Sequence, residues 1–174
     1  MFLFSHRDQY CEFDWALFYN EMKNLIYRAT RSFRYKNISQ ASMFGFELNL
    51  TWSVHKFLSG ECGYSYIDFD QSTTELNDYV PQHKVHLILT SRTGFGTVIN
   101  YEAAYVDERV FMYGSNSVSS LPDYLIQNIN FSQALSKYLT VRLEVSNVTD
   151  EYYEEEFGFP QPGRQIMGGV KLSF

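Results

Sequence analysis

Residues 139–146 of the chain read LTVRLEVS, a segment in which apolar and polar side chains alternate. Leucine and valine occupy every second position, and threonine, arginine, glutamate and serine occupy the positions between them. A period of two residues places the apolar side chains on one face of a β-strand and the polar ones on the other. A helix would need apolar residues three or four positions apart. Residues 139–146 are therefore predicted to form a strand with one apolar face.

The same period of two residues recurs on both sides of this segment. Residues 46–54 alternate Phe, Leu, Leu, Trp and Val with polar residues, and much of 165–174 alternates in the same way. Weaker copies of the pattern fill most of the remaining chain. Together they predict eight strands. Their ranges are 10–26, 34–54, 57–69, 82–93, 97–113, 122–135, 138–153 and 164–174.

The connections between these strands are alternately long and short. Those after the second, fourth and sixth strands are tight turns, whereas those after the other strands are longer and polar: 27–33, 70–81, 114–121 and 154–163. An antiparallel meander would then have short turns at one end and long loops at the other. Outer-membrane barrels have this asymmetry, with short periplasmic turns and long extracellular loops. Several strands also reach the length of about 9–11 residues that a tilted strand needs to cross a bilayer.

Composition and charge exclude several classes of protein. The 174 residues include 14 basic and 20 acidic side chains, a net charge of −6, which argues against a nucleic-acid binder because such proteins need a basic face. A hydrophobic content of 45% is too high for a disordered chain. No stretch approaches the roughly 18 uninterrupted apolar residues of a membrane helix. The apolar run at residues 1–4 is too short for a secretory signal, so an exported form would need a longer precursor.

Aromatic side chains help to decide what the apolar faces contact. Aromatic residues make up 18% of the chain, and several lie on the predicted apolar faces, often near strand ends: Trp52, Tyr64, Tyr66, Tyr101, Tyr105, Phe131 and Phe174. Membrane barrels carry aromatic girdles in these places, where the strands meet the two interfaces. A soluble lipocalin-like barrel would instead turn its apolar faces inward around a ligand. The aromatic positions and the strand lengths favour the membrane barrel.

Short motifs near the C-terminus and upstream of it occur in a specific order. Asn147, Asp150 and Tyr153 form an Asn-x-x-Asp-x-x-Tyr segment, which a Pro-Gly-Arg turn at 162–164 follows. Residues 35–47 contain Tyr-x-Asn, Ala and Gly-x-Glu, and residues 81–83 read Pro-x-His. In this order, and with a terminal aromatic residue, the motifs resemble the C-terminal barrel of TonB-dependent outer-membrane receptors of the siderophore and cobalamin type. The resemblance extends from about residue 13 to the end of the chain.

The resemblance implies a fold, a function and a set of partners. The expected fold is all-β: residues 1–174 would form an antiparallel up-and-down section of a transmembrane β-barrel, with about eight strands and without the plug domain or TonB box. Because the family's barrel has about 22 strands, the chain would supply only its C-terminal part. The implied function is TonB-energised import of iron chelates or cobalamin across the bacterial outer membrane. The implied partners are outer-membrane lipid, lipopolysaccharide, the barrel assembly machinery, the TonB complex through the missing N-terminal part, and a small metal chelate.

Two alternatives from other classes remain open. The first is a complete eight-stranded outer-membrane barrel with an adhesin or structural role. The second is a soluble lipocalin-like binding protein. A plug-coding segment upstream in the genome would favour the receptor over both.

Aromatic residues in the expected long loops are candidates for ligand contact. Tyr79, Tyr113 and Tyr124 could stack on a chelate or form hydrogen bonds with it, although loop aromatics more often serve ordinary packing. The alternating C-terminal residues resemble the signal that the barrel assembly machinery reads, and they also suit a lipid-facing strand. These residues are Ile166, Gly168, Val170, Leu172 and Phe174.

No catalytic group, cofactor or metal site is predicted. His83 and His86 are three positions apart, so on a strand they point to opposite faces and should not share a metal. Two acidic groups suit solvated loop flanks, with the binding of divalent cations as the alternative. They are Asp150, Glu151, Glu154, Glu155 and Glu156 in one loop, and Asp68, Asp70, Glu75 and Asp78 in another.

The two cysteines are expected to remain free thiols. Cys11 and Cys62 fall in the first and third predicted strands, with the second strand between them. Two strand spacings place them about 9–10 Å apart, whereas a disulfide needs Cα atoms within about 7 Å.

Overall fold

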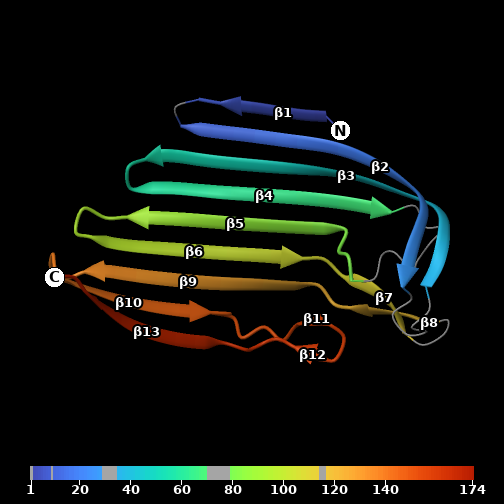
Figure 1. Ribbon diagram of the computed structural model, residues 1–174. Coiled ribbons are helices and arrows are strands. Elements are labelled where there is room, and N and C mark those ends of the chain that lie inside the picture. Colours follow the sequence, from blue (N-terminus) through green and yellow to red (C-terminus); the bar gives the residue numbers. More distant parts are fainter. Residues whose placement is uncertain (1, 9, 29–34, 70–78, 114–116) are drawn as a thin grey trace.

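Nine antiparallel strands form one sheet in the computed structural model, which describes residues 2–8, 10–28, 35–69, 79–113 and 117–174 (Figure 1). Their order in space is β1-β2-β3-β4-β5-β6-β9-β10-β13. The bounds are β1 (Phe2–Arg7), β2 (Cys11–Arg28), β3 (Tyr35–His55), β4 (Leu58–Phe69), β5 (His83–Arg92), β6 (Thr97–Val106), β9 (Tyr124–Ala134), β10 (Leu139–Ser146) and β13 (Gln165–Leu172). Within the described residues, no helix is long and apolar enough to cross a membrane.

Two short hairpins stand outside this sheet, both at its long-loop end. β7 (Arg109–Tyr113) pairs with β8 (Ser117–Leu121) in the connection between β6 and β9. β11 (Glu154–Glu156) pairs with β12 (Phe159–Pro160) in the connection between β10 and β13. The described residues at the opposite end of the sheet form tight turns (Figure 1). The predicted meander with one plain end and one elaborated end is confirmed.

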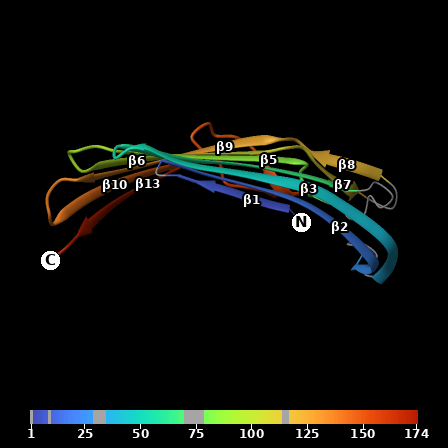
Figure 2. The same ribbon diagram turned by 90° about the horizontal axis from the view of Figure 1, so that it is seen from above.

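The sheet is curved and open (Figure 2). β1 and β13 lie at its two edges, and the described strands do not pair them with each other. The described residues therefore do not form the closed eight-stranded barrel of the alternative interpretation.

The strand register collects the apolar side chains into a continuous apolar face. One row of directly paired residues crosses the sheet from β1 to β9 through Phe4, Trp15, Leu48, Tyr64, Val85, Tyr105 and Leu125. The neighbouring positions on each strand point to the other, polar face, where Asp14, Asn49 and His86 lie in one row. A shift of one residue in any pairing would turn that strand's apolar side chains to the polar face. The alternation therefore specifies this register.

Polar side chains within the apolar face form hydrogen bonds with one another. The Tyr64 hydroxyl and His83 Nδ1 lie 2.7 Å apart, and the Tyr101 hydroxyl donates to Gln127 Oε1 at 2.7 Å. Near the short-turn end, Thr97 Oγ1 donates to Gln133 Oε1. Each pair joins neighbouring strands, so these polar atoms do not depend on solvent for a partner. Such pairing suits an apolar surface that water does not reach.

Three glycines of the sheet each lie opposite an aromatic or imidazole ring on the neighbouring strand. The pairs are Gly45 with Phe18, Gly60 with Trp52, and Gly63 with His86. A Cβ atom built on Gly45, Gly60 or Gly63 would come within 2.4, 2.3 or 1.9 Å of the opposing ring. Each ring therefore fills the space that the missing side chain leaves. This packing fixes the pairing of β2, β3, β4 and β5 at particular residues.

The structure corrects the strand predictions at several points. The sequence interpretation missed β1, whose register with β2 is supported by the Phe4–Trp15 ring stack and the Arg7–Glu12 ion pair. The predicted strand 97–113 breaks at Asp107, whose side chain accepts a hydrogen bond from the Glu108 amide, and the chain then forms β7 outside the main sheet.

Two further predicted strands, 138–153 and 164–174, are shorter in the structure than predicted. The predicted strand 138–153 ends at Ser146 because Asn147 adopts a φ of 51° and turns the chain out of the ladder. Asparagine tolerates this left-handed conformation better than most residues. The last strand covers 165–172, so Phe174 lies beyond it and is fully exposed. Cys11 and Cys62 are both free, as expected from β3 lying between their strands.

Candidate functional site: a cluster of loop aromatics around Arg109

Aromatic side chains from three long connections meet at the loop end of the sheet. The Phe111 ring stacks on Tyr79 at 5.0 Å with an interplanar angle of 9°, and it contacts Phe157 at 5.3 Å. Tyr124 and Tyr153 lie 4.5 Å apart. We call these residues and Arg109 the loop cluster: Tyr79, Arg109, Phe111, Tyr124, Tyr153 and Phe157. Tyr79 comes from the β4–β5 connection, Arg109 and Phe111 from β7, Tyr124 from the start of β9, and Tyr153 and Phe157 from the β10–β13 connection.

Arg109 lies at the centre of the loop cluster, and only 3% of its surface is exposed. Its guanidinium lies 4.7 Å from the centre of the Tyr124 ring, close enough for a cation–π interaction. Nη2 donates to the Pro122 carbonyl at 3.2 Å, and Nη1 donates to the Glu155 carbonyl at 3.4 Å. Arg109 therefore joins β7, the start of β9 and the β11–β12 hairpin.

β7 presents Arg109 and Phe111 on the same side because they are two positions apart on a strand. Phe111 is 2% exposed, and Leu121 of the paired strand β8 is 5% exposed. The backbone also ties in the β4–β5 connection, since the Tyr79 amide donates to the Val110 carbonyl at 2.9 Å. These contacts make the β7–β8 hairpin the element that links the other long connections.

A second set of contacts shapes the connection that carries Tyr153. The Asn147 side chain is 4% exposed; its Oδ1 accepts from the Glu151 amide, and its Nδ2 donates to the carbonyls of Glu151 and Pro162. Asp150 Oδ1 accepts from the Arg164 amide at 2.7 Å. The Asn-x-x-Asp segment and the Pro-Gly-Arg turn therefore hold the two ends of one connection together. Their role in this structure is to position the β11–β12 hairpin.

The charges around the loop cluster are mainly negative. Burial raises the pKa of the Tyr153 phenol, and the nearby Glu155 carboxylate raises it further. Glu154 accepts hydrogen bonds from the Tyr152 hydroxyl at 2.7 Å and the Gly158 amide at 2.8 Å, which lower the pKa of its carboxyl group. A depression of about 260 Å³ lies at the same end of the sheet, with Asp107 and Glu108 in its lining beside apolar residues.

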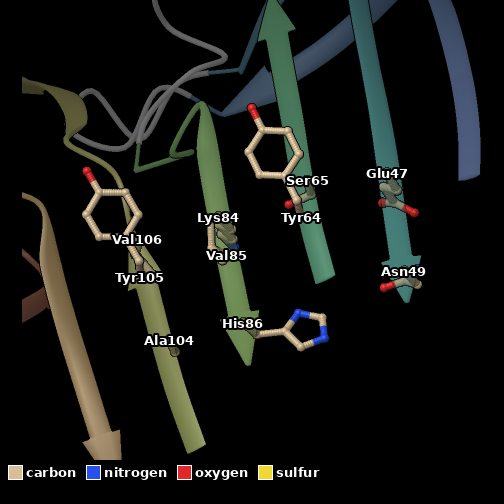
Figure 3. A pocket seen from close by; sticks show the side chains of 10 residues that line it. All are labelled: Glu47, Asn49, Tyr64, Ser65, Lys84, Val85, His86, Ala104, Tyr105 and Val106. Atoms are coloured by element: carbon tan, nitrogen blue, oxygen red, sulfur yellow. The ribbon is translucent and has the colours of Figure 1, made fainter. Parts of the chain in front are cut away.

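The polar face of the sheet contains two further hollows, which lie away from the loops. One, of about 310 Å³, is lined in part by Glu47, Asn49 and Lys84. In Figure 3 the His86 ring points from β5 toward the strand that carries Asn49, and its Nε2 lies 3.4 Å from Glu61 Oε1. The other hollow, of about 460 Å³, shares Glu47 and Asn49 and extends to β1. These hollows are open depressions in one strand wall.

The structure brings together two of the three predicted ligand contacts. Tyr79 and Tyr124 both belong to the loop cluster. The backbone of Tyr113 ends β7 opposite Ser117, but its side chain lies outside the described residues. Sequence reasoning missed Arg109, Phe111, Tyr153 and Phe157, because it placed Phe111 inside a long membrane strand and gave Arg109 no partner. The only hint in the sequence was that several aromatic residues occur in the polar connections.

The two histidines point to opposite faces of the sheet, as the sequence predicted. His83 bonds to Tyr64 on the apolar face, whereas His86 lies on the polar face beside Glu61. The described residues contain no group of three or more His, Cys, Asp or Glu side chains that could hold a metal ion. Asp70, Glu75 and Asp78 of the second acidic group lie outside the described residues.

The C-terminal alternating residues line the apolar face at the sheet edge. Ile166, Gly168, Val170 and Leu172 pair with Val145, Leu143, Val141 and Leu139 of β10. Their side chains are exposed, and nothing lies within 4 Å of a Cβ built on Gly168.

Several solved receptor structures contain a strand arrangement similar to that of this chain. The ferripyoverdine receptor of Pseudomonas aeruginosa matches 99% of the chain with a TM-score of 0.81 at 17% sequence identity, and the match covers 26% of that receptor. The siderophore receptor PiuA of Acinetobacter baumannii matches 98% of the chain with a TM-score of 0.77 at 19% identity, over 27% of its length. The ferric yersiniabactin uptake receptor FyuA of Yersinia pestis matches 98% with a TM-score of 0.78 at 16% identity, over 28% of its length.

These likenesses establish the fold, and the chain spans about a quarter of the length of the receptors named. No curated protein matches the chain. The family model for TonB dependent receptor-like β-barrels matches residues 6–148, which includes the main sheet from the end of β1 to the end of β10. The chain therefore belongs to the β-barrel family of TonB-dependent receptors.

Proposed function

We propose that the chain is the C-terminal part of the barrel of an outer-membrane receptor that imports a metal chelate with energy from the TonB complex. The observation that carries this proposal is the loop cluster, which gathers aromatic side chains from three connections at one end of a sheet whose strands reach the length needed to cross a bilayer. Aromatic faces and phenol groups suit the partly apolar, oxygen-rich surface of a chelate.

The proposed ligand class is supported by family membership and by the receptors with the same strand arrangement. The named receptors are a ferripyoverdine receptor with ferripyoverdine bound, a siderophore receptor and a ferric yersiniabactin uptake receptor. We therefore favour an iron chelate over cobalamin. Tyr79, Tyr124 and Tyr113 are the proposed contacts, and the newly identified Tyr153 and Phe157 extend the surface. The remainder of the site would come from parts of the receptor other than this chain.

In this proposal the apolar face of the sheet contacts the lipid of the outer membrane. The continuous row from Phe4 to Leu125 and the paired polar atoms within the same face support this orientation. The long connections would then face the cell exterior, where lipopolysaccharide surrounds them, and the polar face would line the lumen. The alternating residues of β13 with Phe174 would serve as the signal for the barrel assembly machinery.

Uptake of radiolabelled iron by whole cells tests the proposal. Cells that lack other receptors for a given ferric chelate would express the complete receptor that contains this chain, in the presence and absence of TonB. We expect uptake only with TonB, and we expect Tyr124→Ala to reduce it. Tyr138→Ala is the matched control, since Tyr138 is an exposed tyrosine at the short-turn end with Lys137 over its ring.

Two outcomes of the uptake experiment would contradict the proposal. Equal losses in Tyr124→Ala and Tyr138→Ala would show that the loop cluster has no special role. Absence of uptake for ferric chelates and for cobalamin, in cells where the receptor is folded in the outer membrane, would reject the import function.

A separate experiment tests the assembly signal. Removal of Phe174 is expected to lower the amount of folded receptor in the outer membrane, measured by the difference in gel mobility between heated and unheated samples. Phe95→Ala is the control, because Phe95 is an exposed aromatic residue in a short turn, 88% exposed. Equal amounts of folded receptor in all samples would remove the assembly role from Phe174.

A further inference from the structure

The negative charge of the chain is concentrated in its long connections. Residues 107–123 and 147–164 contain eight acidic side chains and two basic ones, which amounts to −6, the same as the net charge of the whole chain. The acids are Asp107, Glu108, Asp123, Asp150, Glu151, Glu154, Glu155 and Glu156, and the bases are Arg109 and Arg164. The remainder of the chain is therefore neutral overall.

Both basic residues in these connections donate hydrogen bonds within the chain. Arg109 is buried, and its guanidinium contacts the Tyr124 ring and the carbonyls of Pro122 and Glu155. Arg164 donates from its backbone amide to Asp150, and Nη1 donates to the Val148 carbonyl at 3.4 Å. The buried Arg109 guanidinium therefore offers no free positive surface beside the loop cluster, whereas Arg164 is exposed at the Pro-Gly-Arg turn.

The acidic groups, by contrast, lie beside the rings of the loop cluster. The Glu155 residue is exposed, and its backbone carbonyl accepts a hydrogen bond at 3.4 Å from Arg109, whose guanidinium lies over the Tyr124 ring. Burial raises the pKa of the Tyr124 and Tyr153 phenols, and the Glu155 carboxylate raises it further. Asp123 directly precedes Tyr124, and Glu154 directly follows Tyr153. Aromatic faces also attract cations through their ring quadrupoles. Carboxylates and ring faces thus favour the same sign of charge in a ligand.

We propose that the loop cluster selects its chelate by charge: it prefers neutral or cationic ferric chelates to strongly anionic ones, and Glu155 is a specificity-determining residue. This inference rests on the proposed function, and it deepens that function by naming the charge class of the substrate. When the other long connections are counted as well, the net charge of the connections remains negative. In the sequence, residues 70–82 add three acids and no base, and residues 29–34 add Arg31 and Arg34; residues 29–34 and 70–78 lie outside the described part of the chain.

Three ferric chelates of different charge test the inference on the complete receptor in lipid nanodiscs. They are a trihydroxamate with a free ammonium group, which is singly positive, a neutral trihydroxamate, and a triply negative tris-catecholate. Isothermal titration would give the three dissociation constants at low salt and again at high salt. We expect the cationic chelate to bind at least about tenfold more tightly than the anionic one at low salt, and we expect salt to narrow this difference by screening.

The variant Glu155→Gln isolates the contribution of one carboxylate. It should weaken binding of the cationic chelate about threefold, as expected for one partly exposed ion pair, and it should strengthen binding of the anionic chelate. A purely structural role of Glu155 would weaken the binding of all three chelates alike. Glu12→Gln is the matched control, because it removes the same charge near the short-turn end, where Glu12 pairs with Arg7.

The possible results separate this inference from the function on which it rests. Binding of the anionic chelate as tight as that of the cationic one would overturn the charge preference while leaving chelate binding intact. Equal effects of Glu155→Gln and Glu12→Gln would overturn the role of Glu155. If none of the three chelates binds to the folded receptor, the proposed function fails and the inference fails with it.

Discussion

The strand wall and the loop end of this chain are held together by different kinds of interaction. In the wall, consecutive residues of each strand join a backbone ladder, and the side chains follow a period of two along continuous rows. At the loop end, a few side chains hold the backbone: Asn147 and Asp150 close one connection, and Arg109 joins three segments. The wall thus depends on a repeated pattern, whereas the loop end depends on individual residues.

This difference decides how each region responds to substitution. In the wall, the face on which a residue lies usually matters more than the residue type, because the ladder is made by the backbone; the glycines that lie opposite rings are the exceptions. At the loop end, each anchoring side chain makes bonds that no neighbour duplicates. Substitutions in the two regions should therefore differ in how much stability they cost and in whether the loss of structure stays local.

A charge placed on the apolar face should have the largest effect. Leu143 lies on that face between Phe131 and Gly168, so Leu143→Arg is expected to cost about 2–4 kcal/mol if the position is near the middle of the bilayer. Thr140→Arg on the polar face should cost much less, since Thr140 lies between Ala134 and Lys171. Denaturant titration of the complete barrel in lipid vesicles would measure both. Equal costs would reject the assignment of the two faces.

Loss of the Asn147 side chain should have the next largest effect. Asn147→Ala leaves the Glu151 amide and carbonyl and the Pro162 carbonyl without their partner, and it replaces a residue suited to a φ of 51°. We expect a cost of about 2–3 kcal/mol. Hydrogen exchange should increase for the amides of 147–164 while those of β5 and β6 stay protected. A uniform increase across the sheet would show that the connection is not an independent unit.

A methyl group on Gly63 should have a smaller effect. Gly63→Ala forces the His86 ring to move, because a Cβ at this position would lie 1.9 Å from His86 Cε1. The expected cost is about 1–2 kcal/mol, in the lower range for overpacking, since the ring can rotate toward the open hollow. Gly168→Ala is the control, because a Cβ there meets nothing within 4 Å. Similar unfolding midpoints for the two variants would argue against the claim that packing of a ring over a glycine fixes the register of the strands.

Acidification should have the smallest effect, and it should act on turns at both ends of the sheet. At the loop end, a hydrogen bond from the Tyr152 hydroxyl is the main cause that lowers the pKa of the Glu154 carboxyl. In a short turn at the other end, a hydrogen bond from the Tyr10 amide is the main cause that lowers the pKa of the Asp8 carboxyl. Because the pKa of each carboxyl is lower in the folded state than in the unfolded state, its carboxylate contributes fully to the free energy of unfolding above the unfolded pKa. This contribution is lost as the pH falls through the folded pKa.

Amide exchange at Gly158, corrected for its intrinsic dependence on pH, would measure this loss. Protection should fall as the pH drops below the ordinary carboxyl value of 4.5, because protonated Glu154 is a poorer acceptor for the Gly158 amide. Glu154→Gln keeps an acceptor oxygen but does not titrate, so its protection should be independent of pH over the same range. If protection of the Gly158 amide depended on pH in Glu154→Gln as it does in the parent chain, another titrating group would be responsible.

The amino-acid sequence alone determined the strand wall. The alternation in residues 139–146 and in the other strands predicted the faces, the antiparallel meander and the end that carries the long connections. Local pattern is sufficient here, because a period of two together with a tight turn leaves one register that keeps the apolar side chains on one face. The same pattern failed for β1, where Leu3 lies on the polar face and weakens the alternation. It also extended two strands beyond the turns at Asp107 and Asn147.

Only the tertiary structure decided how the loop end is built. Tyr79, Phe111 and Phe157 are far apart in the sequence and have no shared period, yet their rings are in contact. Arg109 was unremarkable as a single charge within the predicted strand 97–113, but burial against Tyr124 makes it the link among the connections. Contacts of this kind arise when separate loops pack over the end of a sheet. They depend on where the strands place each loop, so no local period in the chain encodes them.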